Sequence, residues 1–252
     1  MKRSFLFFLF LIATVFPGYA QKNWFDLGMK GSFFSSWLMN ANMMNDKYVR
    51  YVPSYGYCGG GKIGYSLNPE IEFTADFLYS NFTQELKDNI STESWSRKIS
   101  LTSFDIPVLF RRNKEVSFSE VGIQYSSVLG AKESLVSSSP STLDYSISNA
   151  KNNFVSSGIA AVFGFGSFLG GTENNTFIMG FRFTYGLQDI LSSAGGKGQN
   201  YPSPPYPGYN SSSSKTYKAT HPLTIGLTLE VNHDLGYLVR SGCRRHREFL
   251  FF

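Results

Sequence analysis

The sequence predicts an all-β fold: an eight-stranded antiparallel up-and-down transmembrane β-barrel with four long extracellular loops and short periplasmic turns. Three observations predict it. Eight segments alternate large apolar residues with small or polar ones, the period of two that is typical of β-strands. Their connections run long, short, long, short, long, short, long, which in a meander places all long loops at one rim. The apolar face is rich in aromatic residues, with 24 Phe and 15 Tyr among 252 residues, whereas only 16% of the chain is charged.

The first twenty residues have the pattern of a secretory signal peptide. Lys2 and Arg3 precede an apolar run from Phe5 to Phe16, and the small residue Ala20 stands at the expected cleavage site. The run is too short to cross a bilayer comfortably, although a retained N-terminal anchor is the alternative. We therefore expect residues 1–20 to be a cleaved signal peptide.

The first four predicted strands cover residues 24–34, 55–67, 71–82 and 98–111. Their apolar faces carry Phe25, Leu27, Met29 and Phe33; Tyr57, Ile63 and Tyr65; Phe73, Phe77 and Tyr79; and Phe104, Ile106, Val108 and Phe110. Residues 35–54 and 83–97 lack this alternation and are predicted to be long loops, whereas Asn68–Pro69–Glu70 predicts a tight turn. Pro107 lacks a backbone N–H, so it favours a bulge or a weakened ladder position.

The last four predicted strands cover residues 118–132, 154–168, 176–188 and 222–231. Residues 133–153 and 189–220 form the third and fourth long loops, and the fourth contains a cluster of Pro and Tyr. The strand 176–188 alternates most clearly. At a tilt near 40° its length rises roughly 30 Å, enough to cross a hydrocarbon layer.

The composition of the second face decides which face meets lipid. It consists mainly of Gly, Ser and Thr with a few charges of both signs, whereas the outer face of a soluble barrel would be rich in Lys and Glu. Small residues fit the crowded interior of an eight-stranded barrel. We therefore expect the aromatic face to contact lipid. Arg182 should then point into the lumen, with Asp76, Asp105 or Glu230 as its partner.

The inward face carries nine charged residues that we interpret as a structural network plugging the lumen. They are Asp26, Lys30, Lys62, Glu72, Asp76, Asp105, Arg111, Arg182 and Glu230. The alternative is a proton or ion path along the same residues. An eight-stranded barrel is too narrow for an open aqueous pore, which favours the plug.

Other motifs give weaker signals. Gly56–Lys62 fits seven places of a phosphate-binding loop, but Ile63 replaces the Ser or Thr that magnesium binding needs, and a strand follows instead of a helix. We therefore expect no cofactor, and no Cys or His spacing indicates a metal site. No catalytic residue is predicted. The alternative is a hydrolase or acyltransferase at the outer rim, using His221 with Asp189 and Ser192.

The charge distribution argues against nucleic acid as a partner. The excess of basic residues comes from the two ends of the chain, above all from Arg240, Arg244, Arg245 and Arg247. We divide the chain into a signal peptide (1–20), a barrel (21–232) and a basic tail (233–252). The expected partners are outer-membrane lipid and a protein bound at the extracellular loops or the periplasmic tail. The sequence does not indicate an oligomeric state.

Three short motifs resemble the PorT-like outer-membrane β-barrel family of Bacteroidota: Leu27–Gly31, Phe104–Leu109 and Gly186–Leu191. The resemblance implies an outer-membrane barrel, and the founding member of that family belongs to the type IX secretion apparatus. The basic tail departs from the family pattern. We therefore predict a non-enzymatic outer-membrane barrel with a structural or loop-mediated binding role. An accessory subunit of a type IX secretion or related envelope machine is the alternative.

Overall fold

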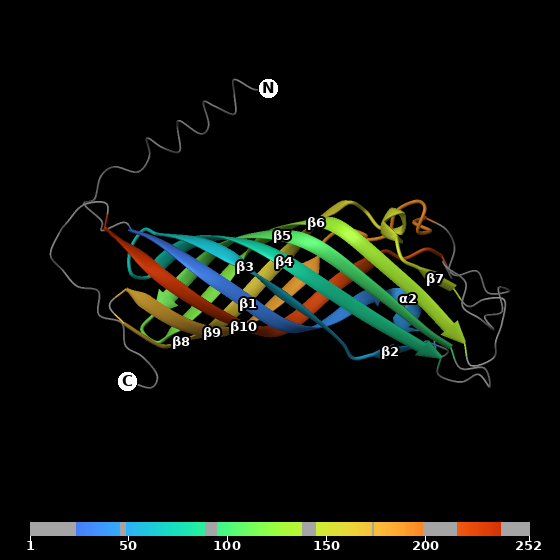
Figure 1. Ribbon diagram of the computed structural model, residues 1–252, viewed down its shortest axis with the longest axis horizontal. Coiled ribbons are helices and arrows are strands. Elements are labelled where there is room, and N and C mark those ends of the chain that lie inside the picture. Colours follow the sequence, from blue (N-terminus) through green and yellow to red (C-terminus); the bar gives the residue numbers. More distant parts are fainter. Residues whose placement is uncertain are drawn as a thin grey trace, which may run out of the picture.

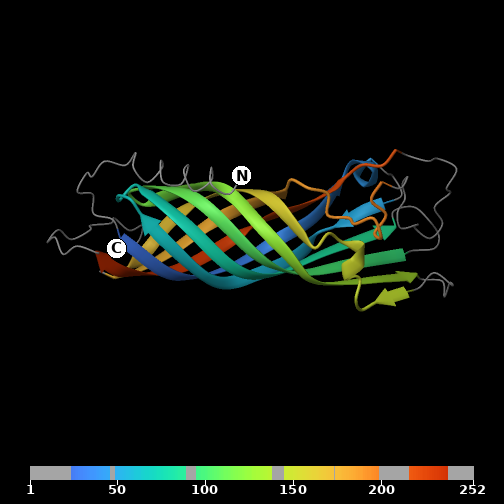
Figure 2. The same cartoon turned by 90° about the horizontal axis from the view of Figure 1, so that it is seen from above.

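Eight long antiparallel strands form a closed ring in the computed structural model (Figures 1 and 2). The structure describes residues 24–45, 49–88, 95–137, 145–172, 174–198 and 216–237, so the predicted signal peptide and residues 238–252 lie outside the described residues. The ring strands are β1 (Trp24–Asn40), β3 (Ser54–Ser66), β4 (Ile71–Asp88), β5 (Trp95–Lys114), β6 (Ser117–Ser137), β8 (Ser157–Gly171), β9 (Asn175–Gly186) and β10 (Thr220–Tyr237).

The ring closes through the pairing of the first and last strands. The β1–β10 ladder runs from Trp24–Tyr237 to Asn40–Thr220. Every other ring strand pairs with its neighbours in chain order, so the predicted up-and-down barrel of eight strands is confirmed. The last strand continues to Tyr237, five residues beyond the predicted end of the barrel at residue 232.

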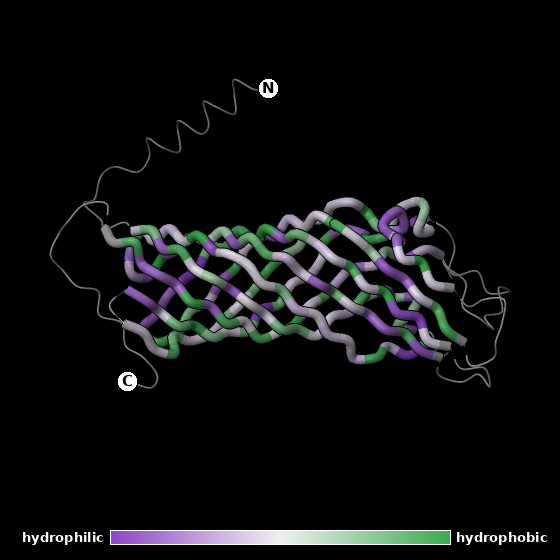
Figure 3. The backbone as a smooth tube through the Cα atoms, viewed as in Figure 1, coloured by the Kyte–Doolittle hydropathy of each residue, from purple (hydrophilic) through white to green (hydrophobic). Residues whose placement is uncertain are grey.

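Side chains alternate between the two faces as the sequence predicts. Large apolar side chains point outward, among them Met29, Phe33, Tyr57, Ile123, Phe163 and Phe181. Many inward positions carry small, polar or charged residues, including the buried Lys62, Asp76 and Arg111, and apolar side chains occupy others. Figure 3 shows hydrophobic and hydrophilic residues alternating along the strands of the barrel wall. Within the described ranges no helix is long and apolar enough to cross a membrane.

Strands β1, β4, β5 and β6 extend further at the long-loop end than the sequence predicts. The predicted loop at residues 83–97 is mostly strand, because β4 continues to Asp88 and β5 begins at Trp95. Inward residues of the extension remain apolar or buried, as Leu86 and Ile99 show. Its outward residues include Glu85, Lys87 and Lys98. Because this outward face is hydrophilic, the stretch as a whole resembles a loop in composition.

Short elements gather at the same long-loop end (Figure 1). Helix α2 (Ala41–Met44) follows β1, and β2 (Val49–Val52) pairs with the end of β4. Strand β7 (Tyr145–Ile147) pairs with the end of β6, and the 3-10 helix η1 is Lys151–Asn153. The predicted long loops at residues 35–54 and 133–153 are therefore partly ordered structure.

An apolar cap packs inside the barrel near this end. Ala150, Phe154 and Ile190, which lie between the ring strands in sequence, pack against inward side chains of β1, β4, β5 and β6. The two capping segments bond to each other, since the Val155 N–H donates to Ile190 O at 2.9 Å. The wall residues of this cluster are Phe34, Leu38, Phe82, Ile99, Leu101 and Ala131.

Two irregularities mark β5 and β6. The β4–β5 ladder is interrupted beside Pro107, where pairs end at Ala75–Val108 and resume at Leu78–Asp105. This is the weakened ladder position that the missing proline N–H predicts. The β5–β6 register shifts between Thr102 and Ser103, which accommodates one extra residue on β6 at Leu129. The bulge moves the inward positions of β6 from even to odd numbers, from Val128 to Ala131.

Candidate functional site in the barrel lumen

A network of buried ion pairs fills the half of the lumen near the short turns. Lys62 from β3 is one centre of it. Its Nζ lies 2.6 Å from Glu72 Oε1, 2.8 Å from Glu230 Oε1 and 3.2 Å from Asp26 Oδ1. Glycine makes the room for one of these carboxylates, because a Cβ on Gly64 would lie 2.3 Å from Asp26 Oδ2.

Arg111 from β5 is the second centre. Its Nη2 lies 2.8 Å from both Glu120 Oε2 and Glu230 Oε2. The guanidinium also stands 4.5 Å from the centroid of the Phe118 ring, close enough for a cation–π contact. Arg111 thereby joins β5 to β6 and, across the lumen, to β10.

Lys30 and Arg182 complete the network at its end nearer the long loops. Lys30 Nζ lies 2.8 Å from Asp76 Oδ2 and 3.1 Å from Glu230 Oε2. Arg182 lies inside the barrel, with Nη2 at 2.7 Å from Glu120 Oε1 and Nη1 at 3.1 Å from Asp76 Oδ2. Its partners are thus Asp76, one of the three candidates from sequence, and Glu120.

The structure therefore brings eight of the nine predicted residues together and adds Glu120. The alternation of β6 places Glu120 on the inward face, so the signal was present in the sequence, although Glu120 was not among the predicted residues. A Cβ on Gly164 would lie 2.7 Å from Glu120 Oε1, which shows that this carboxylate also depends on a neighbouring glycine. The network contains five carboxylates and four cations.

A second ion pair, absent from the predicted set, lies near the apolar cap. Arg97 Nη2 lies 2.7 Å from Glu133 Oε1, and both side chains are buried. Asn153 of η1 donates to the same carboxylate at 3.5 Å. Sequence reasoning missed the pair because residues 83–97 and 133–153 were both predicted to be loops.

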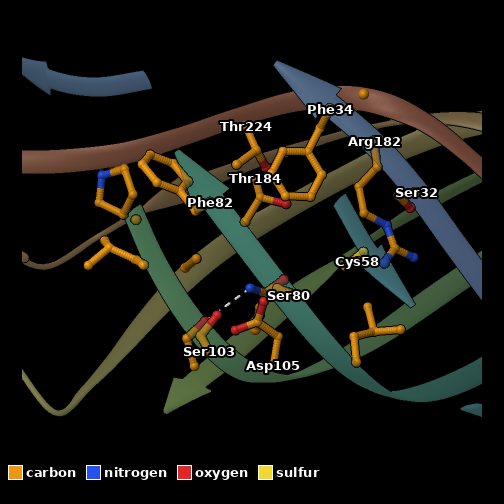
Figure 4. A pocket seen from close by; sticks show the side chains of 18 of the residues that line it. Ser32, Phe34, Cys58, Ser80, Phe82, Ser103, Asp105, Arg182, Thr184 and Thr224 are labelled. Carbon is orange, nitrogen blue, oxygen red and sulfur yellow. Dashed lines mark hydrogen bonds between the residues drawn. The ribbon is translucent and has the colours of Figure 1, made fainter. Parts of the chain in front are cut away.

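Asp105 is the ninth predicted residue, and it stands apart from the network. The residue is 7% exposed, and its Oδ1 has no hydrogen-bond partner among the described residues. The hydroxyls of Ser80, Ser103 and Ser126 approach the carboxylate. Figure 4 shows Asp105 beside Ser80 and Ser103, on the opposite side of a cavity from Arg182.

This cavity, of about 130 Å³, lies between the ion-pair network and the apolar cap. Arg182 lies on its network side, and Ile190 on its cap side. Hydroxyl-bearing and thiol side chains line its middle, namely Ser32, Cys58, Ser80, Ser103, Ser126, Thr184, Thr224 and Thr228. Cys58 is a free thiol in the structure, and Cys243 lies outside the described residues.

The candidate catalytic groups at the outer rim are each bonded elsewhere. His221 Nδ1 donates to Gly186 O at 2.9 Å, and its ring stacks on Tyr185. Asp189 accepts from the Tyr217 hydroxyl and from the Thr220 N–H. Ser192 donates to a backbone carbonyl, Asn152 O. These contacts leave no Ser–His–Asp relay among the three residues in the described structure.

Burial raises the pKa of Tyr217, and the adjoining Asp189 carboxylate raises this pKa further by accepting the phenolic hydrogen bond and by its charge. The Tyr217–Asp189 contact therefore fixes the segment that leads into β10 against the segment that follows β9.

The phosphate-loop motif is part of the barrel wall. Gly56–Lys62 lies within β3 and pairs on both sides, with β1 and with β4. Lys62 is bonded to carboxylates of the network. The described residues contain no group of three or more His, Cys, Asp or Glu that could hold a metal ion.

Comparison with solved structures finds other outer-membrane barrels at low identity. The outer membrane protein OprG from Pseudomonas aeruginosa is 13% identical, with a TM-score of 0.40 over 87% of this chain and 100% of that chain. Neisserial surface protein A is 12% identical, with a TM-score of 0.39 over 82% and 96% of the two chains. Ail of Yersinia pestis is 13% identical, with a TM-score of 0.33 over 81% and 97%.

No curated protein matches the chain significantly. A family model does match, and it describes an outer membrane protein beta-barrel domain over residues 19–192, which is more than half of the chain. This match agrees with the closed barrel and its apolar outer face. The chain therefore belongs to the family of outer membrane proteins with this beta-barrel domain.

Proposed function

We propose that this protein is a non-enzymatic barrel of the bacterial outer membrane with a plugged lumen and a structural or loop-mediated binding role. The observation that carries the proposal is the network around Lys62 and Arg111, whose buried ion pairs cross the lumen. Such pairs occupy space that an aqueous channel would need. Without a channel, the long loops are the parts that reach partners outside the cell.

The extended end of the barrel supports a binding role for these loops. Strands β4, β5 and β6 continue past the predicted loop boundaries, and β2 and β7 pair with their ends. Paired strands hold a loop more firmly than a free chain does, and an ordered base reduces the entropy lost on binding. The loops of this rim thus start from a rigid base.

Loop deletion tests the proposal. Residues 201–209 are removed, and proteins that co-purify after mild crosslinking are compared with those of the full chain. The binding role predicts that crosslinked partners disappear while the barrel still inserts. The plug is tested separately by conductance in planar bilayers, where a steady ion current through the purified protein would contradict it.

The second candidate is an accessory subunit of a type IX secretion or related envelope machine. The motifs Leu27–Gly31, Phe104–Leu109 and Gly186–Leu191, which resemble the PorT-like family of Bacteroidota, support it. Export by a cleaved signal peptide at residues 1–20 belongs to both candidates. A truncation after Val239 that abolishes crosslinking, while the loop deletion leaves it intact, would favour this second role.

A further inference from the structure

We propose that the lumenal cavity binds a small primary amine with an apolar body, and that Asp105 is the counter-ion of the ammonium group. The site lies inside the barrel and is independent of the proposed role of the loops. Three observations support it: a buried carboxylate without a cationic partner among the described residues, a surplus of negative charge, and a cavity with one polar and one apolar side.

The first observation is the Asp105 carboxylate, which three serine hydroxyls approach but which has no cationic partner among the described residues. Asp105 is buried, and its Oδ1 has no partner within the described ranges. A buried carboxylate without a compensating charge is strongly unfavourable. Arg182, the cation that lines the same cavity, is already bonded to Asp76 and Glu120. A ligand cation would supply the missing charge.

The charge balance of the lumen also favours a cationic ligand. The network holds one carboxylate more than its cations, the Arg97–Glu133 pair is neutral, and Asp105 adds a further acid. Among the described residues, the inward side chains around the cavity therefore carry a net negative charge. Its field favours a cation over an anion or a neutral molecule.

The shape of the cavity defines the rest of the ligand. Toward the cap it is lined by apolar side chains, namely Phe34, Phe82, Leu101, Val128, Ala160 and Ile190. The cavity measures about 130 Å³, close to that of engineered cavities of about 150 Å³ that take up benzene. A single ring or a short branched chain therefore fits, with its amine directed to Asp105 and the neighbouring serines.

Cys58 provides a reporter, because it lines the cavity beside Ser80, one of the serines that approach Asp105 (Figure 4). In full-length protein carrying Cys243→Ser, the rate of Cys58 modification by methyl methanethiosulfonate is measured in detergent with benzylamine as the probe. Benzyl alcohol is the neutral probe of similar size, and sodium chloride at equal ionic strength controls for simple screening. Calorimetric titration of benzylamine measures binding directly and does not depend on the reactivity of Cys58.

The proposal predicts saturable benzylamine binding and slower modification of Cys58, with benzyl alcohol and sodium chloride at least tenfold less effective. Asp105→Asn should weaken benzylamine about tenfold or more, because a hydrogen bond between charged groups is lost. Glu85→Gln removes a carboxylate outside the cavity and should leave benzylamine binding unchanged. Equal binding by the Asp105→Asn protein, equal effects of the two probes, or no binding by calorimetry would overturn the proposal.

A second variant covers the case in which Asp105→Asn does not fold. Ala160→Leu keeps Asp105 and adds three carbons to the cavity wall, so it should reduce benzylamine binding by loss of space. Heat-modifiable migration on gels verifies that each variant is a folded barrel. Retention of full affinity by a folded Ala160→Leu protein would place the binding site elsewhere.

Discussion

Arg111 is the residue on which three strands depend. It holds carboxylates from β6 and β10 while its own side chain comes from β5. Removing one member of a buried ion pair leaves its partners charged and without a counter-ion, which costs more than the pair contributes. The stability of the barrel therefore depends on keeping each buried cation together with its carboxylate partners.

Arg111→Met should lower the free energy of unfolding by about 3–5 kcal/mol, because Glu120 and Glu230 lose a shared cation. Urea unfolding in lipid vesicles, followed by tryptophan fluorescence, measures the change. Arg112→Met is the matched control, since Arg112 is exposed and should change stability by less than about 0.5 kcal/mol. Equal effects of the two substitutions would contradict the role of the network.

Ionisation of the Tyr217 hydroxyl should lower the stability of the folded protein at alkaline pH. Its pKa is raised in the folded protein, so its contribution is complete below the unfolded value of about 10 and is lost as pH rises above it. Tyr217→Phe should cost about 1 kcal/mol at pH 8, the value of a typical hydrogen bond, and should flatten the decline above pH 10. Thermal unfolding from pH 8 to pH 11 tests this. The same slope in both proteins would exclude Tyr217 as the titrating group.

At the scale of the element, each strand has a lipid-facing section, and β4 to β6 have a hydrophilic extension. The alternation along a strand sets the face of a side chain, but position along the strand sets whether that face meets lipid or water. This second variable explains why a polar outward face was predicted to be a loop at residues 83–97.

Phe181→Arg should therefore lower barrel stability by about 2–4 kcal/mol, because it puts a charge on the lipid face of β9. Phe181 is 49% exposed in the isolated barrel and lies between Phe165 and Leu227 in the sheet. Val136→Arg, at an outward position of the β6 extension, should cost less than about 1 kcal/mol. Urea titration of both proteins in vesicles compares them. A large cost at Val136 would mean that the extension is also embedded in lipid.

The sequence was sufficient for the facing of the strands, except for the end of β6, but not for the cavity. Alternation alone puts Lys62, Arg111 and Arg182 inward, and it would have placed Glu120 there as well. The cavity depends instead on distances between strands that are far apart in sequence. The bulge at Leu129 reverses the facing of every later residue in β6, including Ala131 of the apolar cap cluster and Glu133. No local pattern encodes that reversal, since a period of two looks the same in either phase.

At the scale of the whole molecule, the barrel is a single ring of strands closed by the β1–β10 ladder. In lipid every backbone polar group must be paired, and a β-sheet achieves this only as a closed ring of strands. Opening any one seam would expose two edges. The fold should therefore resist detergent until it is heated.

Membrane fractions of expressing cells should show heat-modifiable migration. Unheated protein in dodecyl sulfate should run differently from boiled protein, because the closed ladder survives the detergent. Arg111→Met should lower the temperature at which the two bands interconvert. Migration that is the same before and after boiling, from protein found in the periplasm, would contradict the membrane barrel.

Glu230 links the pairing of the last strand to the completion of the ion-pair network. It lies on β10, the last strand to emerge, yet it contacts Lys30 of β1, Lys62 of β3 and Arg111 of β5. Until β10 arrives, each of those three cations lacks one of its carboxylate partners, and the β1 edge of the barrel is still unpaired. The strand pairing that closes the barrel wall therefore also completes the ion pairs of the lumen. A variant truncated before residue 230 would lack both.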